Sequence, residues 1–360
     1  MRIGSIVLVA IVGIGTLFVL LVPDWHWPVP GRQLSLQGPS LVEFPPTGRG
    51  YTVDLTPSVP AGEPDPRPAT TAFRNVQVLT DTDAQTFMRL QKAITQWVSP
   101  REGCGFCHAG GDYASDAKPQ KQVARVMLRM VRHVNASWQN HVGGAGGVTC
   151  YTCHRGQPVP SEVWFRSPPR PTKPMIARQD DWNEDADTVR GFFPREGWDE
   201  YLLQDTPGLS QSYTALPSGQ VSAQIVTKRL YEYMMQMSDG IGVNCGYCHD
   251  SRAFYDWSQS TPARWVGYYG IAMTRDINRN FLLPVAGLIP QDREQPGKAR
   301  QPILPARETG PQTGNGLVLC ATCHHNAPKL PGAGDPLRDL PALGGPDSGS
   351  GLPTALSSSR

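Results

Sequence analysis

The eight cysteines of this chain all belong to one repeated motif, C-x-x-C-H, which occurs four times. The two thiols of such a motif can form thioether bonds to the vinyl groups of a haem, and the adjacent imidazole can bind its iron. The four copies therefore predict four covalently bound haems c, one at each motif. The predicted attachment residues are Cys104, Cys107, Cys150, Cys153, Cys245, Cys248, Cys320 and Cys323, and the predicted proximal iron ligands are His108, His154, His249 and His324.

Three other uses of paired cysteines fit this pattern less well. A thioredoxin-like redox pair needs no histidine after its second cysteine. Structural zinc is complete with four ligands, so cysteine pairs bound to zinc would leave the four histidines without a role. A disulfide scaffold gives no reason for a histidine after every second cysteine. Covalent haem accounts for every cysteine and for the histidine that follows each pair.

The composition indicates a loop-rich folded protein without a large side-chain core. Hydrophobic residues make up 39% of the 360 residues and charged residues 18%, while 37 glycines and 35 prolines account for a fifth of the chain. That share lies below the level typical of low-complexity sequence. The formal charge of +2, without a basic run interleaved with aromatics, argues against nucleic-acid binding.

Helical periodicity predicts a mainly α, loop-rich multihaem cytochrome with one helix before each motif. The first of these helices follows capping residues at Asp81 to Asp83 and stops at Pro100. The string Met130-Val-Arg-His-Val-Asn135 before the second motif resembles Met273-Thr-Arg-Asp-Ile-Asn278 before the fourth. We therefore expect two pseudo-symmetric halves, each with two helix–turn–C-x-x-C-H units. The predicted helices span residues 80–98, 118–141, 222–239 and 262–282.

The expected organisation along the chain has six parts. They are a transmembrane anchor (1–24), an extended Pro-rich segment (25–79), a first haem-binding half (80–156), a connector (157–221), a second haem-binding half (222–326) and an extended or disordered C-terminal tail (327–360).

The anchor is predicted from residues 3–22, which contain no charge. A helix of that length rises about 30 Å, enough to cross the hydrocarbon core of a bilayer. The alternative is a cleaved signal peptide, but the apolar run is long for one and no A-x-A site follows it. Trp25 and Trp27 stand where interfacial aromatics are expected. Arg2 favours a cytoplasmic N-terminus, which places the remainder on the periplasmic side.

The second axial ligands are sought on the helices before the motifs. Met127 and Met130 lie one turn apart before the second motif, and Met234, Met235 and Met237 are close together before the third. The repeat aligns Met127 with Gly270, so a methionine ligand at Met127 would leave the fourth iron to be served from elsewhere. Among the histidines outside the motifs, His26, His133, His141 and His325, the best donor to the fourth haem is His141. His133 is expected on the solvated face of its helix.

These elements resemble the tetrahaem cytochrome subunit of purple-bacterial photosynthetic reaction centres over roughly residues 30–330. The resemblance implies His/Met ligation of three haems and His/His ligation of the fourth, with Met127 serving the second haem, Met234 the third and His141 the fourth. It rests on the strings Trp97-Val-Ser-Pro-Arg-Glu-Gly-Cys-Gly-Phe-Cys-His108, Gly147-Val-Thr-Cys-Tyr-Thr-Cys-His-Arg-Gly156, Met234-Met-Gln-Met-Ser-Asp-Gly-Ile-Gly-Val-Asn-Cys-Gly-Tyr-Cys-His249 and Cys320-Ala-Thr-Cys-His324.

The first haem departs from the family pattern. The family places a methionine six residues before the tryptophan of Trp-Val-Ser-Pro, and this chain has Gln91 there. Met88 lies one turn earlier on the same helical face and is one candidate for the distal ligand. Gln91 itself, or water, is the other. Loss of a thioether ligand should lower the potential of this haem.

The resemblance implies an electron carrier, not an enzyme, on the periplasmic face of the photosynthetic membrane. Implied partners are the reaction-centre L and M subunits, the light-harvesting antenna, and a soluble cytochrome c or high-potential iron–sulfur donor. The subunit would re-reduce the photo-oxidised bacteriochlorophyll pair. Arg264 is a candidate for raising a haem potential, and the acidic stretch 180–205 for steering a basic donor or forming a solvated loop.

Two other classes of haem protein are possible. A membrane-anchored tetrahaem quinol dehydrogenase also joins one helix to four such motifs, but its chains are shorter and mostly histidine-ligated. A multihaem reductase would need an open iron in a substrate pocket, and here that condition could be met only at the first haem.

Overall fold

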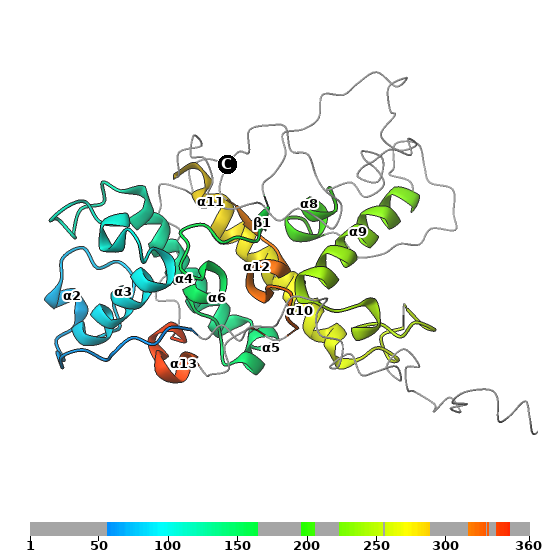
Figure 1. The fold of residues 1–360 in the computed structure, drawn as a ribbon, viewed down its shortest axis with the longest axis horizontal. Helices are drawn as coiled ribbons and strands as arrows, with labels where there is room; N and C mark the ends of the chain where they lie inside the picture. Colours follow the sequence, from blue (N-terminus) through cyan, green and yellow to red (C-terminus); the bar gives the residue numbers. More distant parts are fainter. Residues whose placement is uncertain are drawn as a thin grey trace, which may run out of the picture.

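A helix precedes each motif, close to the predicted positions. The computed structural model describes residues 56–164, 196–205, 223–254, 256–288, 316–328, 330 and 336–345. Within these ranges the chain is mainly helical with long connecting loops, which confirms the predicted class. The four helices are α3 (Ala84–Val98), α4 (Pro119–Ser137), α9 (Ala223–Ile241) and α10 (Pro262–Ile277) (Figure 1).

Local chemistry sets where these helices begin. The Asp83 carboxylate accepts a hydrogen bond from the backbone N–H of Thr86 at 2.6 Å, so α3 starts at Ala84, later than the predicted residue 80. Helices α4 and α10 both start with a proline, Pro119 and Pro262, whose missing N–H costs nothing in the first turn.

The second predicted helix is divided. Helix α4 ends at Ser137, and a separate short helix, α5 (Gln139–Val142), carries His141. The fourth predicted helix continues as one rod, because α10 is followed directly by a π-helical turn (Asn278–Leu282) and by α11 (Leu283–Val285). Pro284 cannot donate to the preceding turn, which favours irregular helix at this point.

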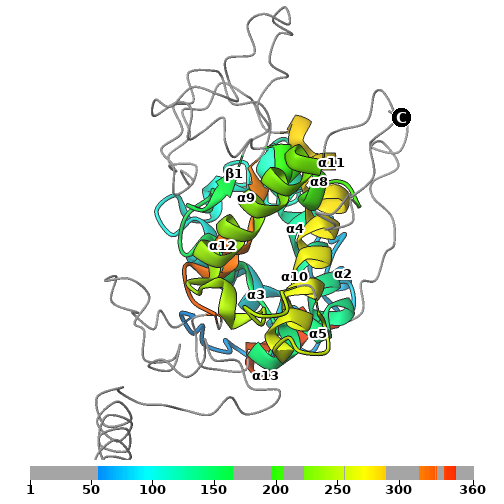
Figure 2. The same cartoon turned by 90° about the vertical axis from the view of Figure 1, so that its right-hand side faces the viewer.

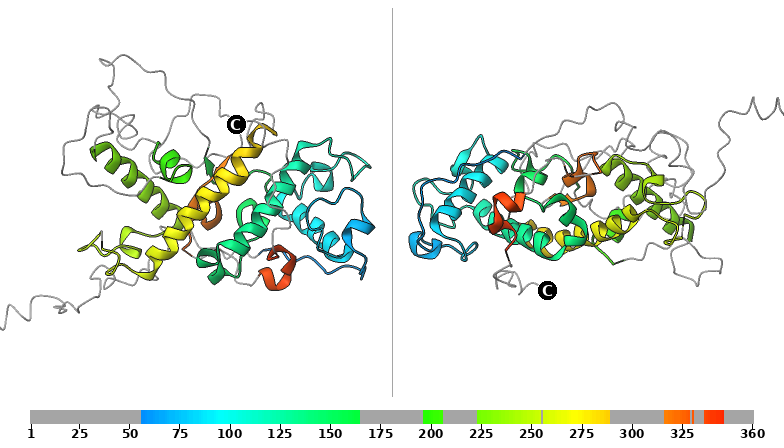
Figure 3. Two further views of the ribbon diagram at one scale, coloured as in Figure 1. Left: turned by 180° about the vertical axis from the view of Figure 1, so that it is seen from behind. Right: turned by 90° about the horizontal axis from the view of Figure 1, so that it is seen from below.

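The helices form two layers. One layer is a row in which α3 contacts α6 (Cys150–His154), α6 contacts α12 (Cys320–His324), and α12 contacts α9. The other layer contains α4 and α10, which lie side by side, and Figure 2 shows them opposite α9 and α12. Figure 3 shows the same pair from behind and the row of motifs from below.

Shorter elements complete the fold. Strands β1 (Val163–Trp164) and β2 (Leu317–Val318) pair antiparallel, with Val163 opposite Val318. The first and third motifs lie in 3₁₀ turns, and the second and fourth lie in the short helices α6 and α12. The remaining elements are α2 (Ala69–Ala72), α8 (Glu196–Leu202), α13 (Pro336–Asp339), and 3₁₀ turns at Gly103–Phe106, Gly143–Ala145, Cys245–Tyr247, Ala286–Leu288 and Pro341–Leu343.

An offset of 143 residues relates α4 to α10 and the π-helical turn that follows it. It pairs Pro119 with Pro262 at the start of the two helices, and Asn135 in α4 with Asn278 just after α10. The two asparagines, both almost fully buried, make equivalent hydrogen bonds. Asn135 Oδ1 accepts from Val148 N–H at 2.7 Å and its Nδ2 donates to Val148 O at 2.9 Å. Asn278 does the same with Val318, at 2.8 and 3.1 Å. Each asparagine thereby fixes the residue two positions before a motif.

Two segments that the sequence left without elements carry buried side chains. The connector contains α8, in which Trp198 and Tyr201 are buried. In the C-terminal tail, residues 336–345 are not extended: they form α13 and a 3₁₀ turn, and Leu343 is fully buried in the core. The Asn135 amide also donates to Leu343 O at 2.9 Å, which attaches this part of the tail to α4.

The predicted membrane anchor (1–24) lies outside the described residues, as does most of the Pro-rich segment that follows it. Within the described part of the chain, every helix is too short or too polar to cross a bilayer.

We predict that Asn135→Ala and Asn278→Ala each lower the free energy of unfolding by about 2–3 kcal/mol. Each substitution leaves a buried N–H and a buried C=O without a partner, at about 1–3 kcal/mol per group. Asn140→Ala, at an exposed asparagine on α5, is the matched control and should change stability by less than about 0.5 kcal/mol. Thermal and urea unfolding of the full chain measure both. Equal effects at buried and exposed positions would contradict this role.

Candidate haem-binding sites

The four motif histidines share one hydrogen-bond pattern. Each Nδ1 faces a backbone carbonyl downstream of its motif, and a carbonyl can only accept, so the ring proton lies on Nδ1. Nε2 then keeps its lone pair, as a histidine metal ligand requires. The pairs are His108 with Tyr113 O (3.1 Å), His154 with Gln157 O (2.9 Å), His249 with Phe254 O (3.0 Å) and His324 with Ala327 O (2.8 Å).

Burial keeps these imidazoles neutral. Loss of solvent lowers the pKa of His108, His154 and His249 below the usual value, and lowers the pKa of His324 to about 4. A neutral imidazole binds a metal without first losing a proton. The electrostatics of all four sites therefore suit iron ligation near neutral pH.

Burial favours the protonated thiol at three of the motif cysteines. Burial raises the pKa of Cys107 and Cys248 to about 11 and that of Cys150 to about 12. Across the residues that the structure describes, no three His, Cys, Asp or Glu side chains converge as a metal-ion site.

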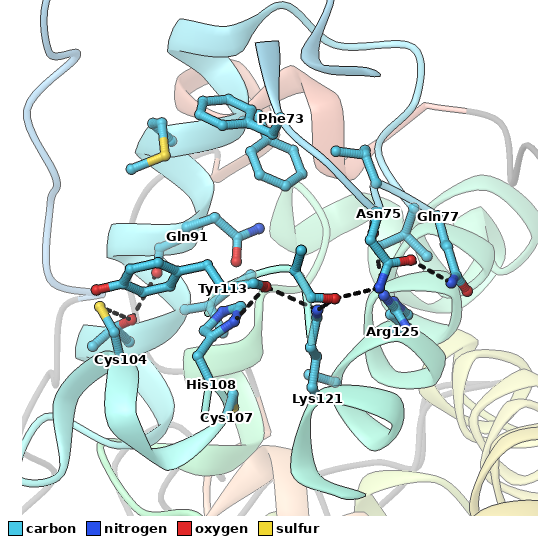
Figure 4. A pocket seen from close by; sticks show the side chains of 18 of the residues that line it. Phe73, Asn75, Gln77, Gln91, Cys104, Cys107, His108, Tyr113, Lys121 and Arg125 are labelled. Atoms are coloured by element: carbon cyan, nitrogen blue, oxygen red, sulfur yellow. Dashed lines mark hydrogen bonds between the residues drawn. The ribbon is translucent and has the colours of Figure 1, made fainter. Parts of the chain in front are cut away.

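The first motif lines a cavity of about 540 Å³ between α3 and α4. Figure 4 shows Cys104, Cys107 and His108 at one end, with Phe73 and Gln91 reaching in from the other side. Its size lies within the range of about 300–1,000 Å³ common for cofactor pockets. An apolar wall around the motif suits a macrocycle, and it is formed by Phe73, Phe87, Ile94, Val98 and Leu128.

A cationic group lies along one side of this cavity. Lys121 and Arg125 are buried, and both pair with Asp116, at 3.1 and 2.9 Å. The hydrogen bond from Arg125 is the main cause that lowers the pKa of Asp116 to about 2. Lys121 Nζ also donates to three carbonyls, those of Tyr113, Ala114 and Ser115, at 2.8–2.9 Å. The loop after the first motif is thus tied to α4, a connection that the sequence did not reveal.

Arg264 occupies the place on α10 that Lys121 occupies on α4, by the same offset of 143 residues. Its guanidinium stacks over the Trp257 ring at 4.0 Å, and its charge lowers the pKa of Cys248 against the effect of burial. Arg264 therefore lies beside the third motif.

The second and fourth motifs meet at the centre of the row. The thiols of Cys153 and Cys323 are 2.8 Å apart, across the contact of α6 with α12. Because α3 flanks α6 and α9 flanks α12, the motifs follow the spatial order first, second, fourth, third (Figure 1).

His141 lies beside the fourth motif, where the sequence predicts it. Its Nδ1 pairs with Val266 O at 2.8 Å, so it shows the same tautomer as the motif histidines. Its ring centroid is 5.9 Å from that of His324, and burial lowers its pKa. Metal–imidazole bonds are about 2.0–2.1 Å for zinc, and two rings at this separation can hold one ion of similar bond length between them. A Cβ on Gly270 would meet the His141 ring at 2.5 Å, so a glycine there makes room for the ring.

The other predicted distal residues have different surroundings. Met127 on α4 and Met234 on α9 are partly buried and pack against the core. Met127 holds the position on α4 that Gly270 holds on α10, where His141 enters. Met88 and Gln91 both line the first cavity, but the Met88 side chain is 40% exposed.

His133 was expected on a solvated face, and this expectation was wrong. Its Nε2 pairs with Asp276 Oδ2 at 2.7 Å, between α4 and α10, and the ring is 30% exposed. Trp138 Nε1 donates to the same oxygen at 2.8 Å. The partner that covers His133 is 143 residues away in the sequence, so neighbouring residues could not reveal it.

The described end of the acidic stretch 180–205 is also paired. Glu200 pairs with Arg229 and Asp205 pairs with Arg275, so these two carboxylates connect α8 and its C-terminal end to α9 and α10. Residues 180–195 lie outside the described residues.

Comparison with known proteins identifies relatives across most of the chain. Residues 48–344 match the family described as photosynthetic reaction centre cytochrome C subunit. The chain is 37% identical to the photosynthetic reaction center cytochrome c subunit of Rubrivivax gelatinosus, over 76% of this chain and 71% of the relative. It is 36% identical to that of Thermochromatium tepidum, over 79% and 67%. It is also 25% identical to cytochrome c-554 of Chloroflexus aurantiacus, over 69% and 68%.

We predict that Gly270→Ala destabilises the chain by about 1–3 kcal/mol, because the new methyl group would overlap the His141 ring. Gly267→Ala, one turn earlier on α10, is the matched control, since nothing lies within 4 Å of its Cβ. Alanine is the better helix former, so the control should raise stability by up to about 1 kcal/mol. Thermal unfolding followed by circular dichroism distinguishes the two. Stabilisation by both substitutions would show that His141 does not occupy this space.

Proposed function

The chain belongs to the photosynthetic reaction centre cytochrome c subunits, and from this premise we propose that it relays electrons through four c-type haems to the photo-oxidised bacteriochlorophyll pair. Membership itself establishes an electron carrier of the reaction centre, with covalently bound c-type haem, at the photosynthetic membrane. The number of haems, the residues that hold them and the individual partners are part of the proposal.

One observation carries the proposal most directly. All four motif histidines use Nδ1 for a backbone carbonyl and leave Nε2 for a metal, although they lie in two different local structures. In each motif the two cysteines would attach the macrocycle and the histidine would bind its iron. The bound haems supply reversible one-electron redox chemistry. The chain's own residues position these groups, neutralise charge and limit solvent access.

We assign the distal positions of three haems to Met127, Met234 and His141, which serve the second, third and fourth. The tautomer of His141, its distance to His324 and the space at Gly270 support the assignment for the fourth haem. The equivalence of Met127 and Gly270 supports the assignment for the second. A thioether raises a haem potential relative to a second imidazole. With this ligand set the second and third haems have higher potentials than the fourth.

The order of the motifs suggests a path. A carrier docked near either end of the row would pass electrons from one motif to the next. The second and fourth motifs are in contact, and the helices that precede the first and third motifs, α3 and α9, contact the second and the fourth. In this proposal the third haem lies nearest the pigment pair, which the L and M subunits hold, and the antenna surrounds the complex. The donor is a soluble periplasmic cytochrome c or high-potential iron–sulfur protein. The N-terminal segment anchors the chain in the membrane.

The proposal predicts four haems per chain and light-driven oxidation of this subunit. Haem should be counted as the pyridine haemochrome in the purified reaction-centre complex, against protein mass. A single saturating flash should bleach the c-type haem absorption band as the pigment pair is re-reduced. A complex reconstituted without this chain is the control. Fewer than four haems, or pigment re-reduction that is equally fast without the chain, would overturn the proposal.

The distal assignment is tested on α4, where two methionines of similar burial lie one turn apart. Met127→His should lower the midpoint potential of one haem, because imidazole replaces thioether. Met130→His is the matched control and should leave all four potentials in place. A redox titration followed by absorption measures both variants. If the midpoint potentials stay unchanged in Met127→His and one of them shifts in Met130→His, the distal ligand of the second haem is Met130.

A further inference from the structure

Two equivalent backbone hydrogen bonds allow α3, the helix before the first motif, to be aligned with α9, the helix before the third. The backbone N–H of Gly156 donates to Trp97 O at 2.7 Å, and that of Asn326 donates to Gly240 O at 2.9 Å. Gly156 and Asn326 each stand two residues after a motif histidine, so Trp97 and Gly240 are equivalent positions. Six residues before them on α3 and α9 lie Gln91 and Met234. Gln91 therefore occupies the place that Met234 occupies in the other half.

Gln91 reaches into the cavity of the first motif. Figure 4 shows its side chain entering from the side opposite His108. The side chain is partly buried, and its amide has no hydrogen-bond partner within the described part of the chain. Its oxygen and its two N–H donors are thus available to a group bound between Gln91 and His108.

Met88 is oriented differently. It stands nine residues before Trp97, and the residue nine before Gly240 is Tyr231. Both side chains are partly exposed, Met88 at 40% and Tyr231 at 55%. Met88 lines the same cavity as Gln91, but its greater exposure places it nearer to solvent than the partly buried Gln91.

We propose that Gln91, and not a methionine, occupies the distal side of the first haem, and that its iron keeps an exchangeable sixth position that takes small neutral ligands such as carbon monoxide. This inference rests on the proposed haem at the first motif. An amide oxygen is a hard donor and competes poorly with the soft thioether or the imidazole for haem iron. The amide acts instead as a hydrogen-bonding group beside a bound water or diatomic ligand.

The cavity is accessible to such ligands. Met88 and Tyr113 both line it, and Tyr113 is 64% exposed, so the cavity reaches solvent between them. The wall around Gln91 is apolar at Phe87 and Ile94, which suits a diatomic molecule. The first haem then differs from the other three in reactivity as well as in potential.

Carbon monoxide binding to the reduced complex tests the proposal. The wild-type protein should bind one carbon monoxide per four haems in the difference absorption spectrum after reduction with dithionite. Gln91→Met should abolish this binding and raise the midpoint potential of one haem, since a thioether takes the sixth position. Met88→Leu is the matched control and should bind carbon monoxide as the wild type does.

Two outcomes would overturn the inference. One is a wild-type protein that contains four haems and binds no carbon monoxide. The other is a Met88→Leu protein that binds carbon monoxide where the wild type does not, which would make Met88 the ligand. The haemochrome count on the same samples separates these results from failure of the proposed function, because that failure would appear as a missing haem. Gln91→Leu, which keeps the side chain similar in size, should retain binding and serves if Gln91→Met does not fold.

Discussion

The side chains of Asn135 and Asn278 make the pair of backbone hydrogen bonds that a neighbouring β-strand would otherwise make. Each amide accepts from and donates to the backbone of one residue, Val148 or Val318, and so satisfies two groups that would otherwise be buried without partners. The segments that lead into the second and fourth motifs have little regular structure of their own. The asparagines hold these segments in place against α4 and the end of α10, and this also positions the motifs that contain His154 and His324.

The motif histidines show that one chemical requirement can be met by two backbones. In the first and third motifs, which lie in 3₁₀ turns, the loop after the histidine brings the carbonyl five residues downstream to Nδ1. In the second and fourth a short helix ends at a left-handed residue, Arg155 or His325, and the carbonyl three residues downstream does the same. The left-handed turn reverses the chain in each case. The tautomer is therefore set by main-chain geometry, and side chains nearby remain free to vary.

The sequence predicted the features that depend on local spacing and left out those that depend on distant partners. The motifs, the four helices, the cap at Asp83 and the alignment of Met127 with Gly270 follow from neighbouring residues. The place of His141 beside the fourth motif was inferred from the gap that this alignment leaves. Helix α8 and the buried Leu343 were missed because a short apolar run next to glycine or proline gives no period. The ion pairs of Asp116 and of His133 were missed because charged residues are expected in solvent until a partner is known.

His133 and Asp276 are equivalent positions, 143 residues apart, and they bind each other. Because corresponding positions of α4 and α10 face each other here, an identical acid or base at both would bring like charges together. A histidine on α4 and an aspartate on α10 avoid that repulsion. Neither residue can be exchanged for the other's type without changing both. If the halves arose from one duplicated gene segment, this contact is a point where the copies had to diverge together.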